Sequence, residues 1–360
     1  MDLVEINSPD DLESWQLPWQ ALAASMPQTT FFHTFDWFRI FWKQAADRAH
    51  VQALAVRSAV GLVGIIPLVA PRKSAGGAET AVHFPTVPWT SWFSAIGREQ
   101  AAAFSVAMAH LAEKTRRRRP LDFGPVAGAA DANCRLTAAL QRAGWQPRRC
   151  PQRTLSRVEL VGSWDDYQRR WTPMWRDEVR WARRALAALG PVRLDRHCPR
   201  PAAQGDGDPR WDLWEDCVAL ARAAATGRCS AERPLSGQNL PWSRACHAAA
   251  ARLGMLDVSV LRLGKRPAAF CYGYRSGGAV EIAQIGYDPA VARWGLGRLV
   301  ASEVIRDSFE RGDASLDLGP GDFRFQRELR TSTATRYRVR CGGAGWRHWL
   351  GRKFSRGQDV

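Results

Sequence analysis

A pair of glycines beside residue 296 gives the clearest chemical signal in this chain. The run Gly295-Leu296-Gly297-Arg298 follows an apolar strand pattern that ends at Tyr287, and it opens a segment with amphipathic helical spacing. Glycines at a helix start let backbone N–H groups approach a ligand closely, and the helix dipole adds positive potential there. With Arg293 and Arg298 nearby, this turn suits a pyrophosphate group. The alternative is a tight turn that needs glycine only for packing.

Three carboxylates near this turn could accept a proton, namely Glu281, Asp317 and Asp322. Asp317 lies between two leucines of a short strand, so strand alternation points it to the face opposite the apolar one. Glu281 also lies between two apolar residues, and burial would raise its pKa toward neutrality. The alternatives are an Asp317 paired with Arg324 or with a helix terminus, and a Glu281 exposed on its strand.

An aromatic segment in the first half of the chain is the candidate for a substrate groove. Trp89 and Trp92 lie in an irregular stretch beside Pro85 and Pro88. Tryptophans in such a loop can line a binding groove, although core packing explains them equally well. The histidines are scattered singly, and the cysteines form no C-x-x-C pair, so we predict no metal site.

Length and charge set the broad class of the protein. A chain of 360 residues predicts two domains of ordinary size. The net charge is +16, of which residues 169–200 supply +6 and residues 324–360 supply +8. Such basic segments attract phosphates of a cofactor, a nucleic acid or a membrane surface, although arginine usage from a GC-rich coding sequence explains them too.

The termini and the apolar runs indicate a cytoplasmic protein without a membrane span. Residues 1–13 are acidic and polar, unlike a signal peptide. The longest apolar run, residues 60–69, is far shorter than the ~20 residues that a spanning helix needs. Peripheral contact with an anionic membrane surface stays open.

Two stretches of the chain read alike and predict a duplicated fold. Residues 316–320 are Leu-Asp-Leu-Gly-Pro, and residues 121–125 are Leu-Asp-Phe-Gly-Pro. Each follows a segment of helical character, and each helix follows a hairpin of apolar strands. Internal self-similarity of this kind is a sign of repeated architecture. We therefore expect an α+β fold of two tandem lobes, residues 1–155 and 156–360, each a mixed, mostly antiparallel sheet flanked by helices.

These features resemble the GNAT superfamily of acyltransferases. In that family the pyrophosphate of acyl-CoA binds the turn between the fourth strand and its helix, with the pattern (Gln/Arg)-x-x-Gly-x-(Gly/Ala). Gly295 and Gly297 match its glycines, whereas Ala292 stands where the Gln or Arg belongs, one place before Arg293. The resemblance implies acetyl-CoA or another acyl-CoA, held by Arg293, Gly295, Leu296, Gly297 and Arg298.

A narrower resemblance is to CelD-like, cellulose-biosynthesis-associated proteins related to the FemAB aminoacyl-transferases. It is carried by an Arg-rich helix at residues 176–184, by Gly286-Tyr287-Asp288, and by the run that starts at Asp317 and reaches Phe325-Gln326 where the family has Tyr-Lys. FemAB-type proteins also have two GNAT-like lobes. The resemblance implies a degenerate first lobe and a catalytic second lobe.

The implied reaction is acyl transfer to an amine or hydroxyl of a sugar, an envelope precursor or a small metabolite. It needs a base, for which Asp317 and Glu281 are candidates, and a donor for the thioester oxyanion, expected from backbone N–H groups near residues 285–287. Tyr287 could protonate the leaving thiolate, or be a core tyrosine. Asp322, Arg324, Trp89 and Trp92 are the candidate acceptor contacts.

Two other functions stay open at this point. One is a FemAB-like transferase that uses aminoacyl-tRNA, which the basic segments would suit. The other is a non-catalytic binder of nucleic acid or anionic surfaces through the aromatic and basic residues of the tail, residues 346–354. Aromatic side chains among basic residues can stack on bases.

Overall fold

The fold is known from a computed structural model, which describes residues 1–72, 80–115, 119–127, 130–224 and 233–342. The tail that carries the predicted stacking residues 346–354 lies outside the described residues. Within the described ranges, no helix is long and apolar enough to cross a membrane.

The first lobe begins with helices and a hairpin. Its elements in chain order are β1 (Asp2–Ile6), α1 (Pro9–Glu13), α2 (Gln16–Ser25), the 3-10 helix η1 (Phe31–His33), α3 (Phe35–Ala45), β2 (Ala49–Ser58), β3 (Gly61–Pro71), α4 (Gln100–Thr115), β4 (Leu121–Val126) and α5 (Ala130–Arg142). Strands β1, β2 and β3 form an antiparallel sheet. Isolated bridges at Val82 and His83 connect β3 to β4.

The second lobe also contains a hairpin followed by a helix and a short strand, within a longer set of elements. Its elements are β5 (Arg148–Glu159), α6 (Trp164–Arg169), α7 (Pro173–Ala187), β6 (Val192–His197), η2 (Ala202–Gln204), α8 (Trp211–Ala223), η4 (Gly237–Asn239), α9 (Leu240–Arg252), β7 (Leu256–Leu263), β8 (Arg266–Ser276), β9 (Ala279–Tyr287), η5 (Pro289–Trp294), α10 (Leu296–Arg311), β10 (Ser315–Pro320), α11 (Arg324–Leu329) and β11 (Ser332–Cys341).

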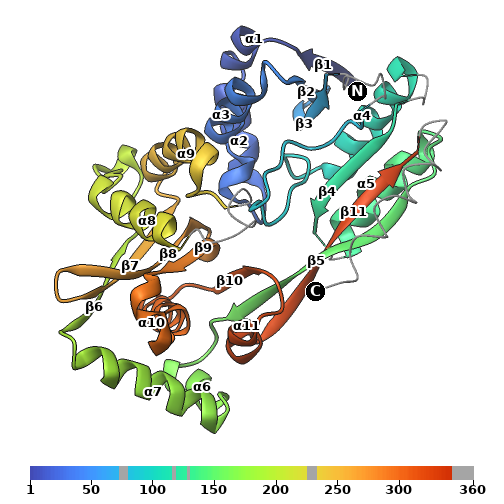
Figure 1. The fold of residues 1–360 in the computed structure, drawn as a ribbon. Helices are drawn as coiled ribbons and strands as arrows, with labels where there is room; N and C mark the ends of the chain where they lie inside the picture. Colours follow the sequence, from blue (N-terminus) through green and yellow to red (C-terminus); the bar gives the residue numbers. More distant parts are fainter. Residues whose placement is uncertain (73–79, 116–118, 128–129, 225–232, 343–360) are drawn as a thin grey trace.

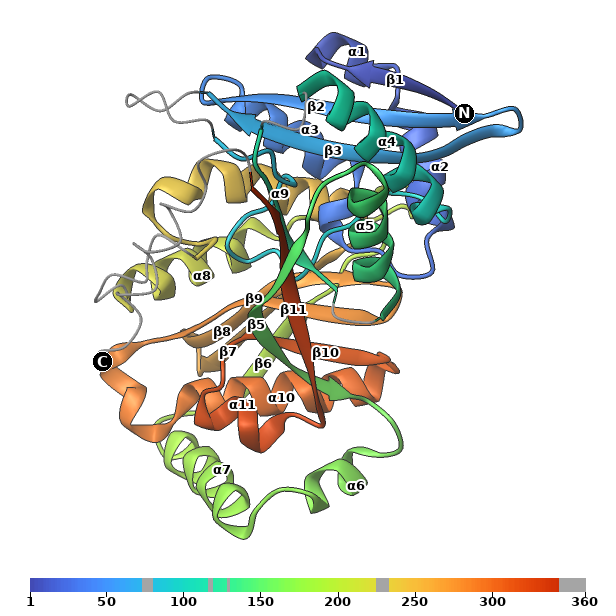
Figure 2. The same ribbon diagram turned by 90° about the vertical axis from the view of Figure 1, so that its right-hand side faces the viewer.

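One large sheet joins the two lobes. Its strand order is β4-β11-β5-β10-β9-β8-β7-β6, so the first lobe's β4 pairs with the last strand of the chain. Figures 1 and 2 show β5 and β11 running as a long ribbon between the upper and lower halves of the molecule. Residue 155, where we placed the boundary between the lobes, lies inside β5. The expected α+β class with mixed, mostly antiparallel sheets flanked by helices is confirmed.

The large sheet has an apolar core on each face. One core packs α10, α6 and α7 against one side, with Leu299 and Val304 of α10 fully buried. The other core packs α8, α9 and the aromatic first lobe against the opposite side. There the ring of Phe31 stacks on Tyr274, with centroids 4.6 Å apart. The lobes therefore share a core, and shared burial fixes their relative position.

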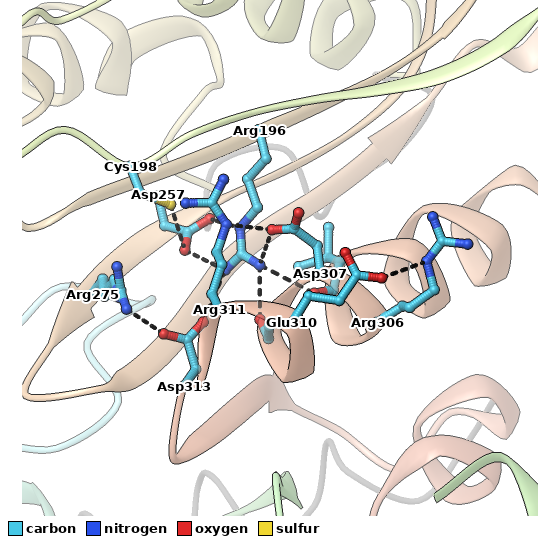
Figure 3. Close-up of polar contacts among 11 residues, drawn as sticks. Arg196, Cys198, Asp257, Arg275, Arg306, Asp307, Glu310, Arg311 and Asp313 are labelled. Atoms are coloured by element: carbon cyan, nitrogen blue, oxygen red, sulfur yellow. Dashed lines mark hydrogen bonds and ion pairs between the residues drawn. The ribbon is translucent and has the colours of Figure 1, made fainter. Parts of the chain in front are cut away.

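A buried ion-pair network fastens α10 to the edge of the sheet. Arg196 of β6, 2% exposed, contacts both carboxylate oxygens of Asp257 at 3.1 and 2.6 Å. Its Nη1 also donates to the Val304 carbonyl and to Asp307 and Ser308 in α10. Asp313, beyond the end of α10, pairs with Arg275 of β8. Figure 3 shows these groups pointing toward one another, which is the arrangement that buried charges need.

Candidate functional site

Two neighbouring strands of the large sheet separate in the middle of the second lobe. Among the described strands, β9 and β10 are the only parallel pair, and their pairing runs from Ala279 opposite Ser315 to Glu281 opposite Asp317. Beyond Glu281, β9 continues to Tyr287 without β10 beside it. A pocket of about 680 Å³ lies at this divergence, lined by Ile282 and Ile285 from one strand and by Leu318 and Gly319 from the other.

A β-bulge marks the start of the divergence. Strand β9 carries one extra residue, Ala283, against β8, where the register moves from Tyr272 opposite Gln284 to Gly273 opposite Ile282. Gly273 makes this approach feasible, because a Cβ there would lie 2.1 Å from the Glu281 carbonyl oxygen. Bulges redirect the strand and its side chains. The sequence analysis missed Gly273, and only its place in a strand of β-forming residues could have indicated it.

The start of α10 opens into this pocket. Gly295 has a φ of +68° and precedes the first helical residue, Leu296. The backbone N–H groups of Leu296 and Gly297 have no backbone acceptor among the described residues, as expected in the first turn of a helix. A Cβ on Gly297 would meet the Tyr287 ring at 3.3 Å. The predicted residues Gly295, Leu296, Gly297, Arg298 and Tyr287 all line the pocket.

Two arginines at the pocket mouth share one carboxylate. Glu178 of α7 pairs through one oxygen with Arg298, and its other oxygen accepts from Arg324 at 2.9 Å. Both guanidinium groups lie over the Trp175 ring, at 5.7 and 6.0 Å from its centroid. Arg324 therefore pairs with Glu178 and not with Asp317, the partner that one alternative reading gave it. The sequence analysis did not single out Trp175 or Glu178 as site residues, and it placed Glu178 only within the Arg-rich helix.

Two predicted residues of the turn and the following run lie elsewhere. Arg293 stacks on the neighbouring Trp294 ring at 4.2 Å and does not line the pocket. Asp322 is exposed and pairs with Arg327 and Arg330 at 3.2 and 2.7 Å, which holds the pKa of its carboxyl below the ordinary range. Asp322 therefore pairs with arginines at α11 and does not line the pocket.

Glu281 and Asp317 lie side by side at the base of the divergence. The Glu281 Oε2 atom is buried and has no hydrogen-bond partner among the described residues. Burial raises the pKa of Glu281 to about 7, and the neighbouring Asp317 carboxylate adds to the rise. Burial also raises the pKa of Asp317, although the Gly319 N–H donates to its Oδ1 at 2.8 Å. Two coupled carboxyls with raised pKa values are typical of proton-transfer sites.

Arginines from β5 and β11 face these carboxylates without contacting them. In the described residues, no ion pair within 4 Å joins Glu281 or Asp317 to any cation. Arg157 is the register partner of Asp317, and Arg336 of β11 is 6% exposed. The Nε atoms of Arg157 and Arg336 are buried without a hydrogen-bond partner in the same residues. Burying charged groups without ion pairs costs folding free energy, so this arrangement indicates a functional site and not a structural role.

The aromatic loop of the first lobe reaches the pocket through one of its two predicted residues. Trp89 lines the pocket beside Pro88, and Arg153 of β5 holds this loop by donating to the carbonyls of Pro88 and Thr90 at 2.7 and 2.5 Å. Trp92 is buried against His33, with ring centroids 4.6 Å apart, and does not line the pocket. Further aromatic and basic lining comes from residues that the sequence analysis did not single out for the pocket, namely Arg233, Phe323 and Phe325.

Comparison with known proteins agrees with this geometry. The family described as an acetyltransferase (GNAT) domain matches residues 175–327, which span α7 to α11 and the whole pocket rim of the second lobe. The second lobe carries a GNAT-type acetyltransferase domain. This match supports an acyltransferase activity in the second lobe. No curated protein sequence matches it.

Solved structures share the fold of this protein over nearly the whole chain. FemX superposes with a TM-score of 0.61 at 10% identity, covering 94% of this chain and 97% of FemX. The C-terminal domain of a putative lysylphosphatidylglycerol synthetase from Agrobacterium fabrum gives 0.56 at 12% identity, over 96% and 95% of the two chains. L-PGS from Bacillus licheniformis gives 0.56 at 11% identity, over 96% and 95%. These identities establish similarity of fold alone.

Proposed function

We propose that the second lobe transfers an acyl group from acyl-CoA to an amine or hydroxyl acceptor. The observation that carries this proposal is the pocket between the diverging strands, which begins at Ile282 and Leu318 and reaches the open first turn of α10. Glu281 and Asp317 are the residues next to this pocket and do not themselves line it. An open helix N-terminus with glycines suits a pyrophosphate, and the divergence offers an apolar channel for the pantetheine arm and the thioester.

Glu281 is the proposed base. A base must be unprotonated at working pH and still attract a proton, so a pKa near 7 suits an ammonium or hydroxyl acceptor. Asp317 keeps the Glu281 pKa high because its negative charge disfavours a second one nearby. Among the described strands, none pairs with β9 beyond Glu281 on the side where β10 lies. We assign the oxyanion donor to backbone N–H groups near residues 285–287 and the proton for the leaving thiolate to Tyr287.

The acceptor is proposed to enter from the side of the first lobe. Trp89 and Pro88 bring the aromatic loop to the pocket, and Arg324 lines the same wall. Aromatic faces next to charged groups suit a sugar ring or a small amine, which agrees with the CelD-like resemblance. We propose an acceptor of this class, such as a saccharide or an envelope precursor.

The test is acyl transfer by the purified protein. Acetyl-CoA is incubated with panels of amino sugars, neutral sugars and small amines, and release of the free CoA thiol is measured together with the mass of each acceptor. Acetylated product with at least one acceptor class is the expected result. Absence of CoA binding by calorimetry would overturn the proposal, and mass spectrometry of molecules that co-purify would then identify the true donor.

An aminoacyl-tRNA donor is the second candidate, favoured by the likeness to FemX over nearly the whole chain and by the basic segments. The two donors differ in salt dependence, because log affinity falls in proportion to the number of phosphates neutralised. We expect CoA binding with a shallow salt dependence, and tRNA binding that is lost near physiological salt. Tight tRNA binding that persists there, without CoA binding, would favour the second candidate.

A further inference from the structure

The arginines that would meet the CoA phosphates are already engaged by a carboxylate of the protein. Glu178 uses one oxygen for Arg298 and the other for Arg324, and these two arginines come from α10 and α11. Arg298 and Arg324 line the pocket and lie over the Trp175 ring, and Glu178 contacts both of them without lining the pocket itself. The Glu178 side chain is about a quarter exposed, so a ligand from solvent can compete with it.

The Arg298 guanidinium also lies directly over the turn that opens α10. A Cβ on Gly295 would be 2.2 Å from Arg298 Nε and 2.7 Å from its Cζ, so the flat guanidinium rests against the Gly295 backbone. This places the arginine beside the unpaired N–H groups of Leu296 and Gly297. An anion bound there would contact backbone donors and Arg298 at once, and it would then stand next to the Glu178 carboxylate.

We propose that Glu178 is a positioning residue that sets the affinity of the pocket for the anionic part of its donor. Glu178 holds Arg298 and Arg324 over Trp175 through two ion pairs. The donor's phosphates must compete with the Glu178 carboxylate for these two arginines. The carboxylate thus lowers the affinity for phosphates and favours release of the CoA product. This inference rests on the proposed function, since it assumes that a phosphate-bearing donor enters this pocket.

The geometry favours competition over support of the bound state. Glu178 accepts from Nη1 of Arg298 and from Nη2 of Arg324, so one carboxylate charge offsets the positive charge of both arginines. A phosphate that approaches the same two arginines is repelled by this carboxylate. Partly exposed charge pairs are worth about 0.2–1 kcal/mol each, so two pairs are enough to change binding several-fold without fixing the fold.

The experiment compares Glu178→Gln with a matched control on the same helix. Asp177→Asn removes the same charge one residue earlier, where Asp177 pairs with Arg180 and does not line the pocket. Affinities for CoA, inorganic pyrophosphate and pantetheine, which lacks the phosphates, are measured by calorimetry. We expect Glu178→Gln to bind CoA and pyrophosphate about fivefold more tightly, as loss of about 1 kcal/mol of competition predicts. Pantetheine should bind all variants equally.

Each outcome decides the matter. Glu178→Asp should stay close to wild type because it keeps the charge, and circular dichroism with thermal unfolding checks that all variants fold. Unchanged or weaker CoA and pyrophosphate binding by Glu178→Gln, or an equal gain by Asp177→Asn, would overturn the role of Glu178 while leaving the proposed function intact. If the wild-type protein binds neither CoA nor pyrophosphate, the proposed function and this inference fail together.

Discussion

Both lobes contain a hairpin followed by a helix and a strand, but the residues at the start of that helix differ between the lobes. In the second lobe, α10 begins at Gly295 and its first turn faces the pocket. In the first lobe, α4 begins at Gln100, whose side chain donates to Ser94 and to the Ala95 carbonyl. The preceding Gly97 lies against β3, since a Cβ there would be 2.7 Å from the Val63 carbonyl. Glu99 precedes the first residue of α4, where Gly295 precedes α10, so the first lobe has a carboxylate and no glycine at this helix start.

The matching aspartates differ in the same way. Asp122 of Leu-Asp-Phe-Gly-Pro pairs with Arg338 and Arg340 of β11 at 3.0 and 3.5 Å. Asp317 of Leu-Asp-Leu-Gly-Pro has arginines nearby but forms no ion pair among the described residues, and its pKa is raised by burial. The matching aspartate is therefore paired in the first lobe and without an ion pair in the second, among the described residues.

Replacing one carboxyl in each lobe by its amide should show this difference most strongly in kcat. Glu281→Gln removes the proposed base, and we expect a loss of about 10²–10⁴-fold in kcat, as typical for general-base removal. Asp122→Asn should leave kcat within about twofold and cost about 1 kcal/mol of stability, because it breaks partly exposed ion pairs. Thiol release from acetyl-CoA measures the first effect and urea unfolding the second. Equal losses of kcat in both variants would contradict the assignment of separate roles.

A paired buried charge should affect stability and not the affinity for CoA. Arg196→Met leaves Asp257 buried without its arginine and Asp313 with Arg275 alone, and we expect a loss of about 3–5 kcal/mol in the free energy of unfolding. The control Arg193→Met removes a pair in which the arginine is 74% exposed, and it should change stability by less than about 0.5 kcal/mol. Similar values for the two variants would show that the network in Figure 3 is not what holds α10.

The smallest expected effect is a shift in pH dependence. A base must be unprotonated, so kcat should rise with pH through the Glu281 pKa of about 7. Asp317→Asn removes the negative neighbour that raises this pKa, so the rising limb should move to lower pH, and kcat well above the limb should change less than in Glu281→Gln. The pH profile of kcat measures the shift. If the rising limb of the kcat profile does not move in Asp317→Asn, the group that titrates is not Glu281.

Much of the second lobe could be predicted from local sequence, because its signals are local. The apolar strand pattern was predicted to end at Tyr287, as β9 does, and the glycines indicated the start of α10. The contacts around them could not be predicted in this way. Glu178 meets Arg324 across 146 positions of the chain, and the pairing of β4 with β11 joins residues more than 200 positions apart. Such contacts depend on tertiary packing, which periodicity does not encode.

The residues of the predicted site also differ in how well local sequence placed them. Gly297 and Tyr287, which lie at or close to the turn, line the pocket together. Arg293 and Asp322 were predicted for the same site but do not line the pocket. Arg293 stacks on Trp294, and Asp322 pairs with Arg330. A side chain's direction depends on partners that its local sequence does not reveal, and this explains why Trp89 reaches the pocket while Trp92 turns into the core.

The most direct test of the account is the stoichiometry of CoA binding by calorimetry in the wild-type protein and in Gly297→Val. Valine at this position would place side-chain carbons against the Tyr287 ring and over the open N–H groups of α10. We predict one CoA per chain, and at least about tenfold weaker binding by the variant, because the anion can no longer reach the helix start. Two CoA molecules per chain, or unchanged affinity in Gly297→Val with the fold intact, would contradict the account.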